Sequence, residues 1–426
     1  RIVGAWGYQM DAHHQLYLRC THESCCFCDH KLPIQIVAEE LYSAPPTLLF
    51  GTVDKFAMMA WKEEVGSFFA VGSSNRAPEL IIQDELHLIS GPLGTMVAMF
   101  ETAIDYLCQE KGVRPKIVAS TATIRRAKEQ CAALYNRDVA QFPAPGLDAS
   151  DSYFAREAVI DYESGKYGRL YVGLMPSGKT KAMMEIRSIA SMMQSIHRMS
   201  LSDEVKDKFW TLTAYFGSLR DLGKCRTLAE DDIKDAITRQ AQRLGTKQDP
   251  RKFYSSDELT SRASTTELNE TLDKLEKTQY SFENYKKVSH LLLATNMISV
   301  GIDVARLNVM LLVGQPKLTS EYIQASSRVG RSFPGVAFTM YDASKSRDRS
   351  HFEQFKQYHE SFYRYVEPTG ATPFSKPARD RSLKALLVAM IRNAEESLRS
   401  ETAASSFTVA QDEDVIEKNK NYIVAR

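Results

Sequence analysis

Short apolar runs, rich in β-branched residues, alternate along the chain with longer segments of helical period. The runs lie at 80–83, 116–120, 169–174, 290–294, 309–313 and 336–340. Runs of this length and composition predict strands buried on both faces of a parallel sheet. Between the first two runs, apolar residues from Met96 to Leu107 recur at spacings of three and four, which predicts an amphipathic helix. This alternation indicates an α/β fold with parallel sheets.

Turn-forming residues interrupt the pattern at 141–165, where FPAPG and ESGKYG occur, and we place a domain boundary there. The long polar segment that follows has a mostly helical pattern, clearest in ELNETLDKLEKT at 267–278. We therefore predict these parts: an N-terminal segment at 1–44, a first α/β unit at 45–150, a second at 160–345 with a helical insertion at about 182–288, and a helical C-terminal extension at 346–426.

Composition narrows the class of protein. With 43% hydrophobic and 25% charged residues in 426, the chain is typical of a soluble globular protein of two or three domains. Lys plus Arg (54) nearly equals Asp plus Glu (53), so any nucleic-acid-binding surface must be local. We find no membrane-spanning run and no signal peptide, and expect a cytoplasmic protein without a membrane partner. Because the first residue is Arg1, we interpret the chain as a piece of a longer protein.

Two acids follow the first predicted strand directly, at Asp84 and Glu85, and His87 comes two residues later. Ligands of open parallel sheets bind beyond the carboxyl ends of the strands, so this pair is placed to hold Mg²⁺ and to activate water. The alternative is a turn with two solvated acids. The next strand ends in hydroxyl residues of the run STAT, at Ser120, Thr121 and Thr123, which could equally be a helix N-cap.

The second half carries a matching set of polar residues. Thr295, Gly301 and Asp303 follow the apolar run at 290–294, and the pattern Q-x-x-x-R-x-x-R comes after the next run. Its members are Gln324, Arg328 and Arg331. Two arginines three apart share one face of a helix, and guanidinium groups beside an acid suit a polyphosphate whose charge grows in the transition state.

The order D-E-x-H, S-T-A-T, A-T-N-x-x-x-x-G-I-D and Q-x-x-x-R-x-G-R resembles motifs II, III, V and VI of superfamily 2 helicases, over about residues 45–345. The resemblance implies two RecA-like lobes with ATP and Mg²⁺ bound between them. It further implies roles for individual residues: Asp84 as the Mg²⁺ ligand, Glu85 as the water-activating acid, His87 with Gln324 and Ser120, Thr121 and Thr123 in coupling between lobes, Gly301 and Asp303 at the nucleotide, Thr295 at a nucleic-acid phosphate, and Arg328 and Arg331 as arginine fingers.

Longer phrases resemble a narrower family, the DrmA helicase-like subunits of bacterial anti-phage DISARM systems. They are PPTLLFGTVDKFAMMAW (45–61), QDELHLISGPLGTM (83–96), ELTSRASTTEL (258–268) and RDRSHFEQFKQYHESFYRYVEPTGATPFS (347–375). This resemblance implies DNA as the substrate and other defence subunits as partners. Thr52 and Lys55 fall where motif Ib would contact the backbone of a nucleic-acid strand.

No phosphate-binding loop precedes Asp84, yet 173–180 reads G-x-x-x-x-G-K-T after a predicted strand. In the helicase order this position belongs to motif IV, so we assign Ser177, Gly178 and Lys179 to contacts with nucleic acid or the other lobe. The alternative is a true P-loop. We expect the real motif I to precede Arg1, so that this piece alone hydrolyses ATP poorly.

Two further segments carry candidate chemistry. Cys20, Cys25 and Cys28 have metal-ligand spacing and predict structural zinc, which the DrmA resemblance would make half of a zinc ribbon; the alternative is free thiols. In 345–381, basic residues alternate with aromatics. Arg347 and Arg349 are candidate phosphate contacts, while aromatics at 352, 355, 358 and 362 have the spacing of a helix packing on the second lobe.

We therefore predict an ATP-dependent DNA helicase or translocase core. Two alternatives remain open at this point: a non-catalytic DNA-binding and assembly module, and a P-loop NTPase that uses Gly173–Thr180.

Overall fold

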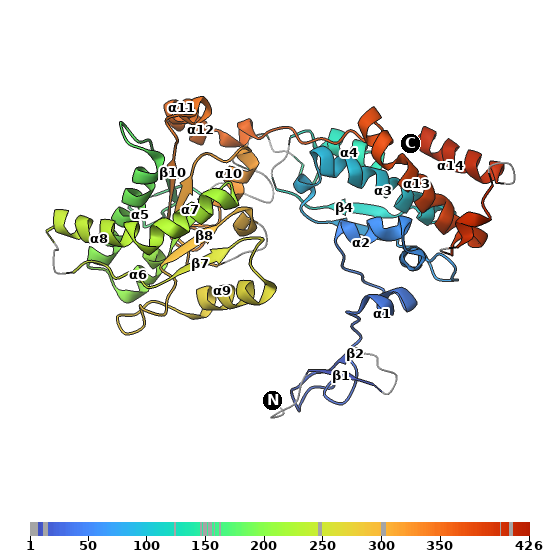
Figure 1. Ribbon diagram of the computed structural model, residues 1–426, viewed down its shortest axis with the longest axis horizontal. Helices are drawn as coiled ribbons and strands as arrows, with labels where there is room; N and C mark the ends of the chain where they lie inside the picture. Colours follow the sequence, from blue (N-terminus) through green and yellow to red (C-terminus); the bar gives the residue numbers. More distant parts are fainter. Residues whose placement is uncertain are drawn as a thin grey trace. The chain divides into compact units, whose positions relative to one another are not determined.

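The computed structural model describes residues 7–11, 16–122, 125–144, 147, 151, 156, 158–161, 163–245, 249–299, 304–400, 402–408 and 412–426. The chain forms two compact units (Figure 1). Unit 1 contains Arg1–Ala140 and Pro368–Arg426, and unit 2 contains Gln141–Glu367. The predicted C-terminal extension at 346–426 is therefore not one part, because its first helices belong to unit 2 and the rest returns to unit 1.

Unit 2 is built on a six-stranded sheet of order β5-β10-β9-β6-β8-β7, in which every neighbouring pair is parallel. Its strands are β5 (Arg169–Leu174), β6 (Leu212–Phe216), β7 (Ser256–Leu259), β8 (Leu291–Ala294), β9 (Val309–Val313) and β10 (Gly335–Met340). The parallel α/β fold and four of these strands are confirmed, with ends within one residue of prediction.

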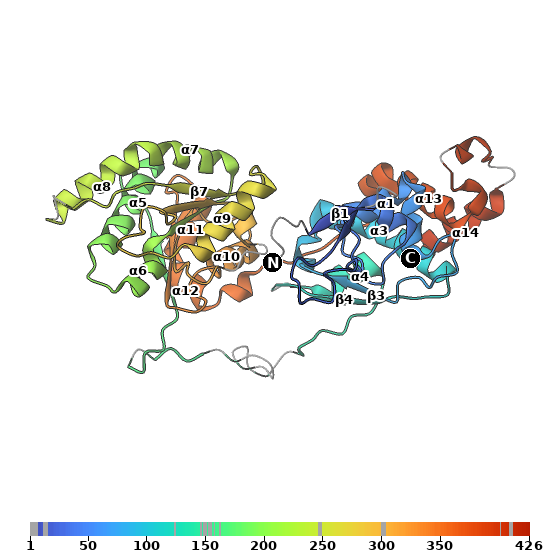
Figure 2. The same ribbon diagram turned by 90° about the horizontal axis from the view of Figure 1, so that it is seen from below.

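Helices cover both faces of this sheet (Figure 2), and they are α5 (Lys181–Arg198), α6 (Asp203–Trp210), α7 (Leu219–Glu230), α8 (Asp232–Arg243), α9 (Thr265–Lys277), α10 (Thr319–Ser326), α11 (Ser346–Glu353) and α12 (Phe355–Glu360). Alternate strand residues point to opposite faces. Thus Leu311 packs with apolar residues of α5, α7 and α8. Leu312 packs instead with residues of α9, α10 and α12. Strands buried on both faces explain the continuous apolar runs in the sequence.

The predicted insertion at 182–288 is wrong, because this segment supplies two strands of the sheet. Strand β6 lies inside the sheet between β9 and β8, and β7 forms one edge. Both escaped prediction because polar residues interrupt them. Thr213 is fully buried in β6, and in β7 Asp257 forms an ion pair with Lys274 of α9. The helix predicted at 267–278 is confirmed as α9.

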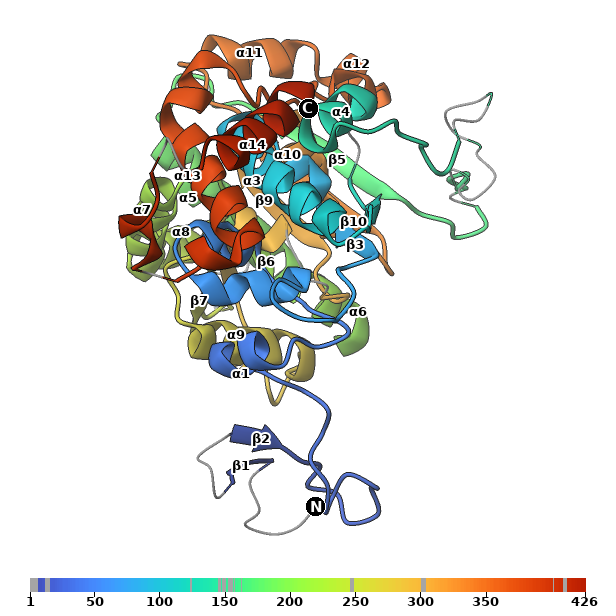
Figure 3. The ribbon, with the colours of Figure 1, turned by 90° about the vertical axis from the view of Figure 1, so that its right-hand side faces the viewer.

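Unit 1 has a two-stranded parallel sheet, β3 (Leu80–Gln83) with β4 (Lys116–Ala119), and a hairpin of β1 (Tyr8–Met10) with β2 (Leu16–Leu18). Its helices are α1 (Ala38–Ser43), α2 (Val53–Ala57), α3 (Gly91–Glu110), α4 (Ala127–Tyr135), α13 (Lys376–Ala394) and α14 (Glu413–Ala425). Helix α3 is the amphipathic helix predicted from the pattern. Helix α13 packs along α3 although the two are far apart in sequence (Figure 3).

Short 3₁₀ helices complete the described elements: Met58–Ala60, Glu63–Phe69, Leu86–Leu88, Asn296–Ser299, Phe362–Tyr365, Glu396–Leu398 and Ala403–Ser405. None of the helices within the described ranges is both long enough and apolar enough to cross a membrane.

One face of the β3–β4 sheet is apolar and exposed. Ile81 and Ile117 pack toward the helices, whereas Leu80, Ile82 and Val118 on the opposite face are 52%, 65% and 46% exposed.

Candidate functional site

Asp84 and Glu85 of unit 1 directly follow the carboxyl end of β3. Ser120, which directly follows β4, lies next to them. The Ser120 hydroxyl donates a hydrogen bond to Asp84 Oδ1, and the Glu85 N–H donates to the same oxygen at 2.9 Å. These two bonds, the Ser120 bond first, lower the pKa of Asp84. Asp84 is thus held as a carboxylate with an exposed face, which is the ligand type that Mg²⁺ prefers.

Glu85 adopts a left-handed backbone conformation, with φ 51° and ψ 46°. A residue with a side chain is strained there by about 1 kcal/mol or more, and such strain concentrates at functional sites. The turn directs Glu85 Oε2 to within 3.3 Å of Nδ1 of His87, which is buried in the 3₁₀ helix Leu86–Leu88. Sequence analysis placed these residues together, and the structure brings them into contact.

Gln130 of α4 holds this turn from behind and was not identified from the sequence. Its buried amide donates to the carbonyl of Leu86 at 3.1 Å and to that of Ile89 at 2.7 Å. A single glutamine in a polar helix carries no sequence signal for this role, because the contact spans more than 40 residues.

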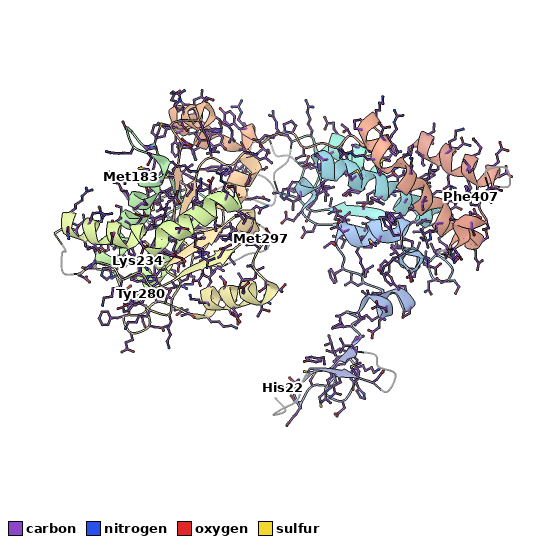
Figure 4. The ribbon with its side chains drawn as sticks, in the orientation of Figure 1. His22, Met183, Lys234, Tyr280, Met297 and Phe407 are labelled. Carbon is purple, nitrogen blue, oxygen red and sulfur yellow. The ribbon has the colours of Figure 1, made fainter. Side chains whose placement is uncertain are left out.

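The second set of residues lies at the carboxyl ends of β8 and β9 in unit 2. Thr295 follows β8, is buried, and precedes the 3₁₀ helix Asn296–Ser299; Met297 of that helix is labelled in Figure 4. Gln324 lies on α10, the helix that follows β9. Gly301 and Asp303 fall outside the described residues.

Arg328 and Arg331 do not lie on a helix, contrary to prediction. Helix α10 ends at Ser326, and the chain turns tightly before β10. Gly330 has φ +70°, and a Cβ on it would come within 2.9 Å of Gly335 Cα. This close approach of two backbones requires glycine and ends the helix before the arginines.

Two arginines that sequence analysis missed support these segments. Arg169 at the start of β5 donates from Nε to the carbonyl of Val329 at 2.7 Å and from Nη2 to that of Ser327 at 3.3 Å. Arg306 is buried, is paired with Asp207 at 2.5 Å, and donates to the carbonyls of Leu275, in the last turn of α9, and of Thr278, just after it. It therefore fixes the chain just beyond Asp303. Neither belongs to a recognisable motif.

Comparison with known proteins gives three consistent findings. Residues 232–333 match the helicase conserved C-terminal domain family. The DISARM protein DrmA of Bacillus paralicheniformis is 41% identical over 414 residues, covering 88% of this chain and 36% of that protein. The crystal structure of DUF1998 helicase MrfA bound to DNA matches with a TM-score of 0.55 at 15% identity, covering 83% of this chain and 41% of that one. The chain is superfamily 2 helicase-like.

The structure of Mycobacterium smegmatis helicase Lhr bound to ssDNA and AMP-PNP is a further neighbour of this helicase-like chain. Its TM-score is 0.51 at 14% identity, and the match covers 85% of this chain and 41% of that one. At such identities the structural neighbours establish the fold alone, which is RecA-like. The helicase-like chain spans about a third of the length of the curated relative that it matches.

The other candidate contacts are spread over both units of the helicase-like chain. In unit 1, Thr52 is exposed just before α2, and the Lys55 ammonium lies 4.9 Å from the centroid of the Tyr42 ring. Thr121 is exposed, and Thr123 lies outside the described residues. These positions leave Thr52 and Thr121 accessible to a ligand.

The G-x-x-x-x-G-K-T segment departs from a phosphate-binding loop at its first glycine. Gly173 lies inside β5 opposite Thr339, and a Cβ there would come within 2.9 Å of the Phe355 ring. It is therefore a packing glycine. The loop proper begins after Leu174, exposes Ser177 and Lys179, turns at Gly178 (φ +64°) and ends where Thr180 caps α5.

The predicted zinc site is not supported. Cys20, Cys25, Cys26 and Cys28 are free thiols near the β1–β2 hairpin, close to His22 (Figure 4). Cys20 Sγ accepts a hydrogen bond from the His22 N–H at 3.4 Å. In the part of the chain that the structure describes, no three potential ligands gather closely enough to hold a metal ion.

In the basic segment that follows β10, two of the residues singled out from the sequence contact the rest of unit 2. Arg347 donates to the carbonyls of Gln315, Pro316 and Lys317 at 3.2, 2.5 and 2.7 Å, so its guanidinium holds the β9–α10 loop, and its role as a phosphate contact stays a prediction. Arg349 is exposed. Tyr358 is buried against the sheet, as predicted for the aromatic stripe, although the stripe is divided among α11, α12 and the 3₁₀ helix Phe362–Tyr365.

Proposed function

We propose that this chain is the core of an ATP-dependent helicase or translocase that acts on DNA in bacterial anti-phage defence. The observation that carries the proposal is the arrangement at β3: an ionised Asp84 bonded to Ser120, followed by a strained Glu85 in contact with His87. Backbone strain of this kind concentrates at functional sites, and at Glu85 it coincides with the acids at the end of β3.

In the proposed reaction, Asp84 holds Mg²⁺ and Glu85 accepts a proton from the attacking water. ATP would supply the phosphoanhydride that water cleaves to ADP and phosphate, and Mg²⁺ held by Asp84 would neutralise part of the phosphate charge. Arg328 and Arg331 serve the same hydrolysis by stabilising charge that develops on the phosphate, and Gln324 with His87 is proposed to couple the two lobes. From the family resemblance, Gly301 and Asp303 remain proposed contacts to the nucleotide, and Ser120, Thr121 and Thr123 remain proposed to couple the two lobes.

Nucleic acid is proposed to contact exposed or strand-end residues on both units: Thr52, Lys55, Ser177, Lys179, Thr295 and Arg349. DNA is favoured because the MrfA structure is of a complex with DNA and the Lhr structure is of a complex with ssDNA. Other defence subunits are proposed partners on the strength of the DISARM relative alone.

The test is ATP hydrolysis by the full-length parent protein, with and without a single-stranded oligonucleotide. We expect Glu85→Gln to lower kcat at least about 100-fold, while AMP-PNP binding persists, because only the proton acceptor is lost. Arg331→Ala should lower kcat by a similar factor.

Glu79→Gln is the matched control, since this exposed acid precedes β3 and pairs with Arg76 on the surface. Full turnover in Glu85→Gln or Arg331→Ala would remove the assigned roles. DNA binding without any hydrolysis in the unmodified parent would favour a non-catalytic assembly module instead.

A further inference from the structure

The chain passes between its two units twice, once between Ala140 and Gln141 and again between Glu367 and Pro368. The second passage differs from the first because residues next to it on either side contact elements of the candidate site. Glu367 contacts α10 in unit 2, and the residues that follow Pro368 contact the segment next to Glu85 and His87 in unit 1. We call residues 367–372 the strap.

At its first residue, the strap is attached to the helix that carries Gln324. Both carboxylate oxygens of Glu367 lie 2.8 Å from the backbone N–H of Thr319, the first residue of α10. The carboxylate thus satisfies an N–H that has no partner within the helix, and it complements the positive end of the helix dipole. Thr319 also accepts a hydrogen bond from buried Tyr358 at 3.3 Å, and Val366, just before the strap, is 1% exposed.

The rest of the strap is attached to the segment behind the acids of unit 1. The Gly91 N–H donates to the Gly370 carbonyl at 2.7 Å, and the Thr372 N–H donates to Thr95 Oγ1 at 3.0 Å. Ala371 packs in the cluster that contains Leu86 and Ile89. These contacts join the strap to the exit of the 3₁₀ helix that carries His87.

Gln130 completes this anchor. The Thr369 hydroxyl donates to its Oε1, while its Nε2 donates to the carbonyls of Leu86 and Ile89. The buried Gln130 amide is therefore hydrogen-bonded to the strap through Oε1 and to the segment that follows Glu85 through Nε2. Since a buried amide without partners costs roughly 1–3 kcal/mol, the two sides are energetically linked.

We propose that the strap is a positioning element that links the water-activating turn at Glu85 to helix α10, which carries Gln324 and leads into the turn that holds Arg328 and Arg331. The proposal rests on the ATPase function proposed above. Pro368 fixes the backbone φ at the passage between the units. The peptide bond between Glu367 and Pro368 is the point where the chain leaves unit 2 and enters unit 1. Glu367 is bonded to α10 and Thr369 is bonded to Gln130, so a displacement of α10 would be transmitted to Gln130 through only two peptide bonds. Glu367, Thr369 and Gln130 are positioning residues and do not touch the reacting atoms.

The first arm of the test loosens the strap without removing any anchor. Two glycines inserted between Glu367 and Pro368 of the full-length protein add up to about 7 Å of slack. We expect the DNA-stimulated kcat to fall about tenfold, with KM for ATP and thermal stability unchanged. The matched control places the same two glycines between Ala140 and Gln141, at the other passage, and should stay within about twofold of the unmodified protein.

The second arm does not depend on hydrolysis. Glu367→Ala should speed hydrogen exchange at the amides of residues 86–91, in unit 1, as well as at 319–322. Glu360→Ala, which removes an exposed acid on α12, should change neither segment. Glu367→Asp should partly restore protection, which a general loss of folding would not allow.

The outcomes separate the two proposals. Exchange changes confined to 319–322, or equal effects of the two glycine insertions, would overturn the strap. Absence of ATPase activity in the unmodified parent, with the exchange response at 86–91 intact, would overturn the proposed function while leaving the mechanical link between the two segments established.

Discussion

At the residue scale, the bond between Ser120 and Asp84 lowers the pKa of the proposed metal ligand. Removing it in Ser120→Ala takes away the largest cause that lowers the pKa of Asp84, so that pKa rises. We expect the acidic limb of the kcat/KM profile to move to higher pH, while turnover at pH 7 stays within about twofold, because an exposed carboxyl with a pKa near the ordinary value of 3.8 is still ionised there.

Ser120→Thr keeps the hydroxyl and should restore the profile. An unchanged acidic limb in Ser120→Ala would show that Asp84 does not hold the metal in its ionised form.

Glu101 makes a second prediction at this scale, concerning stability. It is buried in α3, and desolvation raises its pKa to about 7, while Arg426 opposes the shift. Because the folded pKa lies above the unfolded value of 4.5, its stabilising contribution is full below pH 4.5 and is lost as pH rises through 7. Glu101→Gln should therefore be more stable than the unmodified protein at pH 8, by about 3 kcal/mol, and similar to it at pH 4.5.

Urea unfolding of both proteins at several pH values measures this difference. Equal stability at pH 8 would mean that Glu101 is charged and compensated by Arg426 and Arg137 in the folded state.

At the element scale, the turn between α10 and β10 places Arg328 and Arg331. Gly330 and Gly165 both have positive φ, but a Cβ meets Gly335 at 2.9 Å in the first case and nothing within 4 Å in the second. Gly165→Ala should cost about 1 kcal/mol, for the conformation alone. Gly330→Ala should cost about 2–4 kcal/mol, because crowding adds to that strain.

Unfolding of the two variants by urea tests the comparison. Equal costs would indicate that the backbone around Gly335 moves freely, and that the arginine turn is not rigid.

Elements also show where local patterns stop being informative. The amphipathic pattern from Met96 to Leu107 was sufficient for α3, because its periodicity follows directly from burial of one face. The local pattern was not sufficient to predict β7, because its acidic residues are neutralised by partners outside the strand. Asp257 pairs with Lys274, and Glu258 pairs with Arg226 and Arg262. No local pattern reports partners of that kind.

At the scale of the whole molecule, we expect the exposed apolar face of β3–β4 to favour association between copies of the chain. Leu80, Ile82 and Val118 form it, and exposed apolar sheet surfaces favour self-association. Replacing Ile82 and Val118 with Thr should reduce oligomer formation by the 426-residue chain in analytical ultracentrifugation. Stability should stay within about 0.5 kcal/mol per substitution, because these side chains are exposed.

The control is Ile81→Thr, on the helix-facing side of β3, which should destabilise unit 1 without reducing association. Unaltered oligomer formation in the Ile82 and Val118 variant would mean that other surfaces hold the copies together.

The sequence by itself determined the class of fold, most of the apolar strands, and the polar residues at the ends of β3 and β8. These features could be predicted because a buried strand is a run of consecutive apolar residues and its functional residues follow it directly. It also determined the helicase-like assignment, through the order of short motifs. Only the tertiary structure decided that β6 lies inside the sheet, that Arg328 follows a helix rather than sits on one, and that the chain after Glu367 returns to unit 1. Those features depend on contacts between distant segments, such as Gln130 with Leu86 and Thr369. The free energy that stabilises these features comes from contacts between residues far apart in the sequence, so it cannot be inferred from the pattern of neighbouring residues.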